Sequence, residues 1–319
     1  MIINDRSNIF KIKYIKVKNM KDYRKIWLER IGQPTDYEFE HTLTLERTFE
    51  GDGFDGELYV QANGVGTTQR LMMLFPKNIT EPVPCVAVPF YFPEAMLGYD
   101  PFSGEVLENY TKIAMMYDLV RRGYAVASAD SYHLTYIGSD LERNAFTRWK
   151  LAAEALNSDH PQWTGIGKLV FDTKLMIDAL CADKRTDSSR VGIAGHSLGG
   201  KMAFYTGCLD ERVKVILASD FGIGWDQTNW RDIWYWGDKV DALIAEGLDH
   251  SSLLGSAAPK PMCLLAGKYD NDDSRVMMES AFGYEGAGDV LCVYNHATGH
   301  RPPTDVLERG YDFIDKYLK

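Results

Sequence analysis

The chain has 319 residues, of which 45% are hydrophobic and 25% are charged, a composition that is ordinary for a globular protein. This length favours one domain with insertions over two full-sized domains. The chain has 45 acidic and 35 basic residues, so its net charge is −10. This charge argues against nucleic acids and anionic membrane surfaces as partners.

The first 83 residues predict an extension followed by antiparallel strands. Residues 1–36 form the extension, in which 20–31 carry apolar side chains at helical spacing and predict a short helix. Residues 37–83 alternate polar and apolar side chains between glycine-rich turns, which predicts strands joined by hairpins. The predicted strands are Tyr37–Phe49, Leu58–Ala62 and Arg70–Phe75.

The N-terminus and the cysteines bear on location. The N-terminal residues lack the uninterrupted apolar stretch and the cleavage site of a signal peptide. No apolar run approaches the ~18 residues of a membrane span. The five cysteines show no CxxC spacing, and most lie in apolar runs, as buried thiols do in a reducing compartment. We therefore expect a cytoplasmic protein.

Residues 84–319 predict a catalytic core built as an α/β layer structure. Continuous apolar runs indicate strands that are buried on both faces, and helical segments separate them. This alternation predicts a mostly parallel central sheet with helices on both faces. The expected strands are Cys85–Phe90, Tyr124–Ala129, Arg190–Ala194, Val213–Ala218, Met262–Ala266 and Val290–Tyr294. The expected helices are 109–122, Lys168–Cys181, Lys201–Cys208 and Val306–Leu318.

One connection, Phe221–Pro261, is far longer than the rest. It spans about 40 residues, whereas connections in α/β units usually have about 2–6. An insertion of this length is usually functional, and we predict a lid over the active site. It holds four of the seven tryptophans, which we expect to bind substrate; the alternative is that they anchor the insertion to the core. These residues are Trp225, Trp230, Trp234 and Trp236.

The chemistry is signalled by the G-x-S-x-G motif at Gly195–Gly199. A predicted buried strand precedes it and a predicted helix follows, which is the setting of a nucleophile elbow. In such a turn Ser197 points outward as the nucleophile, and the Leu198 N–H at the helix start is positioned to bind an oxyanion. His196 is the variable residue of the motif and is expected to pack nearby.

A serine needs a base and an orienting acid, which in such sheets follow in the order acid, then histidine. Asp270, after the Met262–Ala266 strand, is the preferred acid. Asp272, Asp273 and Asp220 are competitors, and Asp220 ends the preceding strand. His300 is preferred as the base over His296, because it leads by a short loop into the last helix.

Two further contacts come from loops after strands. The second oxyanion donor should be a backbone N–H in the loop after Cys85–Phe90. No HGGG motif occurs there, and we choose Tyr91. His133, after the Tyr124–Ala129 strand, is a candidate substrate contact.

The motifs GHSLGG, GKYD and TGH, in that order, resemble the α/β-hydrolase superfamily over residues 70–319. The segment LVRRGYAVASAD, residues 119–130, is similar to the branch of dienelactone-hydrolase-like proteins and acetyl xylan or other carbohydrate esterases. Within that branch, carbohydrate acetyl esterases use an aromatic residue of the loop after the third strand as an oxyanion donor, and Tyr91 falls there. The usual His-Gly pair of that loop is replaced by Pro89-Phe90.

The expected function is that of a serine carboxylic-ester hydrolase with a Ser-His-Asp triad and an acyl-enzyme, and the resemblance suggests a carbohydrate acetyl esterase. The substrate would be a small-molecule or carbohydrate ester. Alternatives are a peptidase of the prolyl-oligopeptidase kind and a catalytically silent binding protein of the same fold. No HExxH, zinc-type cysteine spacing or Walker motif occurs, so we expect no cofactor and no metal. The oligomeric state is left open between a monomer and a homo-oligomer.

Overall fold

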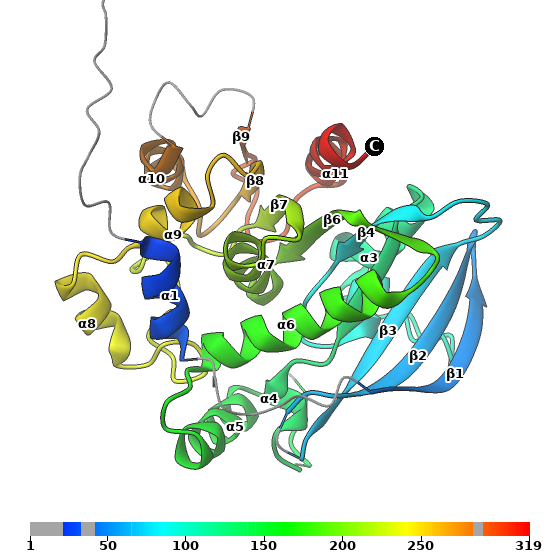
Figure 1. Ribbon diagram of the computed structural model, residues 1–319, viewed down its shortest axis with the longest axis horizontal. Helices are drawn as coiled ribbons and strands as arrows, with labels where there is room; N and C mark the ends of the chain where they lie inside the picture. Colours follow the sequence, from blue (N-terminus) through cyan, green and yellow to red (C-terminus); the bar gives the residue numbers. More distant parts are fainter. Residues whose placement is uncertain (1–21, 33–41, 65, 139, 144, 283–289) are drawn as a thin grey trace, which may run out of the picture.

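The computed structural model describes residues 22–32, 42–64, 66–138, 140–143, 145–282 and 290–319. Over these residues one nine-stranded sheet forms in the order β1-β2-β3-β5-β4-β6-β7-β8-β9 (Figure 1). The strands are β1 Leu43–Gly51, β2 Phe54–Ala62, β3 Thr68–Pro76, β4 Val83–Ala87, β5 Ala125–Ala129, β6 Thr186–His196, β7 Val213–Ser219, β8 Met262–Ala266 and β9 Leu291–Asn295.

The sheet has an antiparallel part and a parallel part, as predicted. Strands β1, β2 and β3 pair antiparallel, and β3 continues antiparallel onto β5. From β5 to β9 every neighbouring pair is parallel. The predicted strands are confirmed within a few residues at their ends. The start of the strand predicted from Tyr37 lies outside the described residues.

Helices cover both faces of the sheet because its strands present apolar side chains on both sides. Leu71 and Met73 of β3 join one core with α1, α5, α6 and α7, while Met72 and Leu74 join the opposite core with α2, α3 and α11. The helices are α1 Tyr23–Ile31, α2 Pro93–Leu97, α3 Met115–Arg121, α4 Tyr132–Thr135, α5 Phe146–Asp159, α6 Gly165–Ala182, α7 Leu198–Leu209, α8 Lys239–Ala245, α9 His250–Ala257, α10 Asp272–Phe282 and α11 Thr304–Leu318, with a 3₁₀ turn at Thr111–Ile113.

The long insertion after β7 carries α8 and α9, and α9 lies beside α1 near the N-terminal end of the described chain (Figure 1). The indole N–H of Trp27 in α1 donates to Ser252 Oγ in α9 at 3.0 Å. The predicted helix at 20–31 is therefore present from Tyr23 onward, and it packs on the insertion rather than standing apart.

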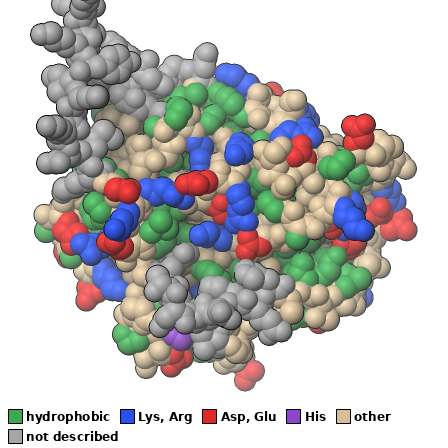
Figure 2. All heavy atoms as spheres, in the orientation of Figure 1, with side chains coloured by type: hydrophobic (Ala, Val, Ile, Leu, Met, Phe, Trp, Pro, Cys, Tyr) green, Lys and Arg blue, Asp and Glu red, His purple; other side chains and the backbone are tan. Residues whose placement is uncertain are grey.

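The carboxyl ends of the parallel strands all open at one edge of the sheet. This edge brings the loops after β4, β6, β7, β8 and β9 together, and ligands of open α/β sheets bind there. Figure 2 shows acidic and basic side chains interspersed over the face that it displays, as on a solvated surface. None of the helices in the described part of the chain is long and apolar enough to cross a membrane.

Candidate active site

Ser197 lies at the sharp turn between β6 and α7. Its backbone has φ 56° and ψ −114°, a conformation that residues with a Cβ rarely adopt. The turn is closed so tightly that a Cβ on Gly195 would lie 2.1 Å from the Gly199 carbonyl oxygen. Because only glycine fits at that point, the helix can start close to the strand and hold the serine in its strained conformation.

His300, in the loop between β9 and α11, pairs with the carboxylate of Asp220. His300 Nδ1 lies 2.7 Å from Asp220 Oδ2. The histidine side chain is partly exposed, whereas the aspartate is fully buried. An ionised carboxylate accepts a hydrogen bond from Nδ1–H, so it selects the tautomer whose Nε2 is free to accept a proton.

Asp220 follows the last residue of β7 and is surrounded by hydrogen-bond donors. Its two oxygens accept the backbone N–H groups of residues 267–270 at 2.8–3.1 Å. Burial disfavours the charge, but the bonds from His300 and these N–H groups outweigh it and lower the pKa of Asp220. Asp220 is therefore built to stay ionised beside His300.

The sequence-based choice of Asp270 as the partner of His300 is wrong. Asp270 accepts from Gly222 N at 2.9 Å, Ile223 N at 2.8 Å and Ser274 Oγ at 2.9 Å. Both aspartates lie in the loops that follow neighbouring parallel strands, at the same sheet edge, so their positions in the sequence did not distinguish them. The other two competitors, Asp272 and Asp273, lie exposed in the first turn of α10.

Ser197, His300 and Asp220 line one cavity of about 420 Å³. Its lining contains both aromatic and polar side chains, and most of the further polar ones belong to the insertion after β7. The aromatic lining residues are Tyr91, Phe146, Trp149, Phe221, Tyr235 and Tyr269, and the other polar ones are Lys201, Thr228, Asn229 and Asp232.

Lys201 is a cavity residue that the sequence analysis missed. It lies four residues after Ser197 in α7, and its Nζ donates to Thr228 Oγ1 at 3.0 Å and Asn229 Oδ1 at 2.8 Å. The ammonium also lies 4.3 Å and 4.1 Å from the ring centres of Trp230 and Tyr235. Burial lowers the pKa of Lys201 to about 7. The signal that could have found it is the four-residue spacing, one helical turn from the nucleophile.

The two predicted oxyanion donors lie on segments that are packed together. Leu198 is the first residue of α7, where a backbone N–H has no acceptor within its own helix. A Cβ on Gly199 would lie 2.1 Å from the Pro89 carbonyl oxygen, which brings the loop after β4 against the start of the helix. In that loop the carbonyl of Tyr91 accepts the Ser131 N–H at 3.0 Å. The roles of Leu198 and Tyr91 stay predictions.

The four tryptophans predicted to bind substrate are all buried, and none is among the described residues that line the cavity. The indole N–H groups of Trp225, Trp230 and Trp236 donate to Leu248 O, Gly222 O and Tyr205 Oη. Trp234 lies behind the wall, stacked on Phe146 with ring centres 5.8 Å apart. We correct the substrate-binding assignment: the insertion lines the cavity with other residues, and its indoles anchor it to the core.

The remaining histidines of this region do not share the position of His300. His296 Nδ1 lies 2.7 Å from Thr298 Oγ1. His133 is fully buried and stacked on Trp149, so the expected substrate contact is not available to it, and burial lowers its pKa to about 3. His196 packs beside His300 with ring centres 4.5 Å apart, as expected.

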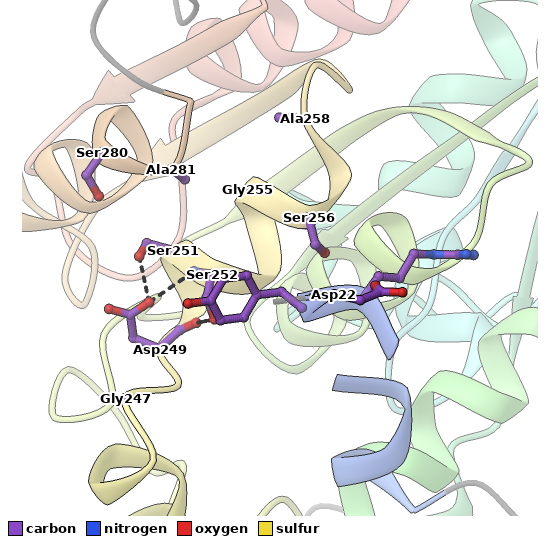
Figure 3. Close-up of a pocket in the computed structure, with 12 residues that line it drawn as sticks. Asp22, Gly247, Asp249, Ser251, Ser252, Gly255, Ser256, Ala258, Ser280 and Ala281 are labelled. Carbon is purple, nitrogen blue, oxygen red and sulfur yellow. Dashed lines mark hydrogen bonds between the residues drawn. The ribbon is translucent and has the colours of Figure 1, made fainter. Parts of the chain in front are cut away.

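A larger cavity of about 740 Å³ lies between α1, α9 and α10 (Figure 3). Its polar groups largely bond to one another: Ser251 Oγ and Ser252 N donate to Asp249 Oδ1 at 2.6 Å and 3.0 Å. These are the capping bonds of α9. Among the described residues that line it there is no histidine.

Comparison with known proteins supplies a family. The sequence profile described as "Abhydrolase family" matches residues 20–233, which is more than half of the chain. The protein "Putative hydrolase YtaP" of Bacillus subtilis (strain 168) is 24% identical over 251 residues, covering 74% of this chain and 79% of that protein.

Solved structures of similar fold include two esterases. A glucuronoyl esterase from Solibacter usitatus has a TM-score of 0.71 at 14% identity, covering 92% of this chain and 90% of that one. An acetyl xylan esterase from Paenibacillus sp. R4 has a TM-score of 0.61 at 16% identity, covering 95% of this chain and 96% of that one. At these identities the likeness establishes the fold, which is the predicted one.

Proposed function

The chain belongs to the Abhydrolase family, and we propose that it is a serine esterase that hydrolyses carboxylic esters through an acyl-enzyme on Ser197. One observation carries the proposal: the strained serine of the elbow and the hydrogen-bonded pair of His300 and Asp220 line the same cavity. A nucleophile, a base and a group that orients the base are the parts that acyl transfer requires.

In the proposed mechanism Ser197 Oγ attacks the ester carbonyl carbon while His300 Nε2 takes the serine proton. Asp220 holds the Nδ1–H of His300 and stabilises the imidazolium that forms. The backbone N–H groups of Leu198 and Tyr91 bind the oxyanion, and removing one such donor typically costs about 2.7–4 kcal/mol of barrier. His300 then protonates the leaving alcohol, and a water molecule hydrolyses the acyl-enzyme by the same steps.

A carbohydrate ester is the substrate class that the cavity favours. A sugar ring presents an apolar face, which suits aromatic side chains, and hydroxyl groups, which suit polar ones. Phe146, which is 64% exposed, supplies an accessible aromatic ring, while Asn229 and Asp232 supply hydrogen-bonding groups. The esterases of similar fold named above act on substrates of this class by their names, which agrees with the proposal.

The test is a substrate panel on the purified protein and two variants. The panel compares p-nitrophenyl esters of short and long acyl chains, acetylated xylose, a methyl glucuronate ester and aminoacyl amides. We expect sugar esters to have the highest kcat/KM and Ser197→Ala to abolish turnover of all esters. Ser251→Ala removes a serine that lines the larger cavity between α1, α9 and α10, and it should leave every rate unchanged.

Two results would contradict the proposal. Faster hydrolysis of aminoacyl amides than of any ester would favour a peptidase. Equal ester turnover in the parent and in Ser197→Ala would remove the proposed nucleophile.

A further inference from the structure

We propose that Asp270 is a positioning residue, which acts through Asp220 by fixing the loop that carries it. The inference rests on the proposed function, because it assigns Asp220 to His300. It concerns two buried aspartates in the loops that follow neighbouring strands, of which only one contacts the histidine.

The first set of contacts joins the side chain of Asp220, after β7, to the backbone of the loop after β8. Asp220 has φ 42°, a conformation that is uncommon for a residue other than glycine. Its carboxylate lies among the backbone N–H groups of residues 267–270, which come from the loop after β8. These bonds fix the two carboxylate oxygens and leave Oδ2 in reach of His300.

The second set of contacts joins the side chain of Asp270, after β8, to the backbone of the loop after β7. Asp270 ends the β8 loop, and its oxygens accept the backbone N–H groups of Gly222 and Ile223, which follow Asp220 in the chain. Each aspartate thus binds the backbone of the segment that carries the other. Two loops that are crossed in this way cannot shift independently, so the contact between Asp220 and His300 depends on Asp270.

An aspartate is the residue type that this position requires. Three donors point at its two oxygens, the third being Ser274 Oγ. An amide in its place would direct an NH₂ group at a backbone N–H and leave a buried donor without an acceptor, which is costly. Burial is the largest influence on Asp270 and raises its pKa, while the hydrogen bonds from Ile223, Gly222 and Ser274 act in the opposite direction. Nothing in its contacts reaches His300, so its effect must pass through the loop.

The experiment is a double-mutant cycle on kcat and KM. Asp270→Asn alone should lower kcat by about 10- to 100-fold, with KM within about twofold, because small misplacements of a catalytic group have effects of this size. In the Asp220→Asn background the same change should lower kcat by less than about twofold, since there is no longer a carboxylate to position. Ser274→Ala is the matched control, as it removes one bond to Asp270 but keeps both bonds to the loop, and its kcat should stay within about threefold.

A spectroscopic readout separates this inference from the proposed function. The Nδ1–H proton of His300, bonded to a carboxylate, should give a far-downfield NMR resonance that does not depend on any substrate. It should be present in the parent and in Ser274→Ala, and it should be broadened or lost in Asp270→Asn. If Asp270→Asn does not fold, Asp270→Ser, which is smaller and keeps one acceptor, should give the same result in weaker form.

The outcomes are decisive in both directions. Equal losses of kcat from Asp270→Asn in the two backgrounds, or an unchanged resonance with unchanged kcat, would overturn the inference and leave the esterase proposal standing. If the parent hydrolyses no ester but shows the resonance, and Asp270→Asn lacks it, the proposed function fails and the positioning role of Asp270 stands.

Discussion

Two aromatic regions lie side by side in this protein, and each contains a histidine. One is the cavity around Ser197. The other, the aromatic interior, is the buried cluster formed by Trp27, Tyr205, Trp225, Trp230, Trp236 and His250. In the cavity His300 is partly exposed and bonded to a carboxylate, whereas His250 is fully buried between two neutral partners, Tyr205 Oη and the Ile223 carbonyl.

The difference shows that partner and solvent, rather than residue type, decide what a histidine can do. Burial lowers the pKa of His250 to about 3, so it stays neutral at any working pH. Asp220 places a carboxylate beside His300, and in the proposed mechanism this negative charge stabilises the imidazolium. A general base must carry a proton for part of the cycle, and only the cavity histidine is equipped for this.

The two regions meet in the short segment after Asp220. The Gly222 carbonyl accepts from Trp230 Nε1 at 2.7 Å, and the Ile223 carbonyl contacts His250. The N–H groups of the same two residues donate to Asp270. The aromatic interior therefore supports one side of the loop that follows Asp220. The buried tryptophans of the insertion hold this loop against the core.

The largest effect is expected from replacing each of the two histidines by alanine in a separate variant. His300→Ala should lower kcat by at least about 10⁴-fold while the melting temperature changes little, because a triad acts as a unit. His250→Ala should keep kcat within about tenfold but lower the free energy of unfolding by about 2–4 kcal/mol, since it leaves a cavity and two buried groups without partners. Steady-state kinetics and urea unfolding distinguish them, and a reversed pattern would exchange the roles of the two regions.

The next effect concerns the buried indoles. Trp230→Ala should lower the free energy of unfolding by about 3–5 kcal/mol, because the side chain is fully buried. The ranking of substrates by kcat/KM should not change, since the indole does not line the cavity. A variant that unfolds at the parent's urea concentration yet prefers a different acyl group would mean that the indole does contact substrate.

A smaller effect is expected at the rim of the cavity. Phe146 lines it and is 64% exposed, so Phe146→Ala should leave the melting temperature unchanged. Loss of one aromatic stacking surface should lower kcat/KM for sugar esters by about tenfold and spare small p-nitrophenyl esters. Leu151→Ala is the control, because Leu151 is an exposed residue of the same helix outside the cavity. Equal losses for both classes of ester would argue against sugar stacking at this site.

The smallest effect is a dependence of stability on pH from Lys201. Its pKa is lowered to about 7 in the folded protein, so between pH 7 and its ordinary value of 10.5 the unfolded state binds more protons. Stability from this group therefore rises with pH, by about 1 kcal/mol between pH 7 and pH 8. Urea unfolding of Lys201→Met should lack this increase, whereas Lys214→Met, at an exposed lysine, should retain it. An identical pH slope in both variants would contradict the assignment.

The fold was predictable because buried parallel strands leave a strong pattern. Met262–Ala266 was found with its true ends, and the elbow was placed by the strand and helix that flank it. The pairing of His300 was not predictable, because Asp220 and Asp270 both follow adjacent strands and only the loop contacts distinguish them.

The tryptophans failed as a signal for a related reason. A cluster of indoles in an insertion fits a substrate wall and a buried anchor equally well, and sequence spacing does not show which face they occupy. The cavity residues that the insertion does supply, such as Asn229 and Asp232, are ordinary polar residues with no pattern of their own.

The central claim is that Ser197 is the nucleophile activated by His300 and Asp220. Its most direct test is the reaction of the purified protein with a fluorophosphonate, followed by mass spectrometry of the peptides. We expect a single adduct on the peptide that contains Ser197, no adduct in Ser197→Ala, and much slower labelling in Asp220→Asn. Modification of a different serine, or labelling of Ser197→Ala at the parent's rate, would contradict it.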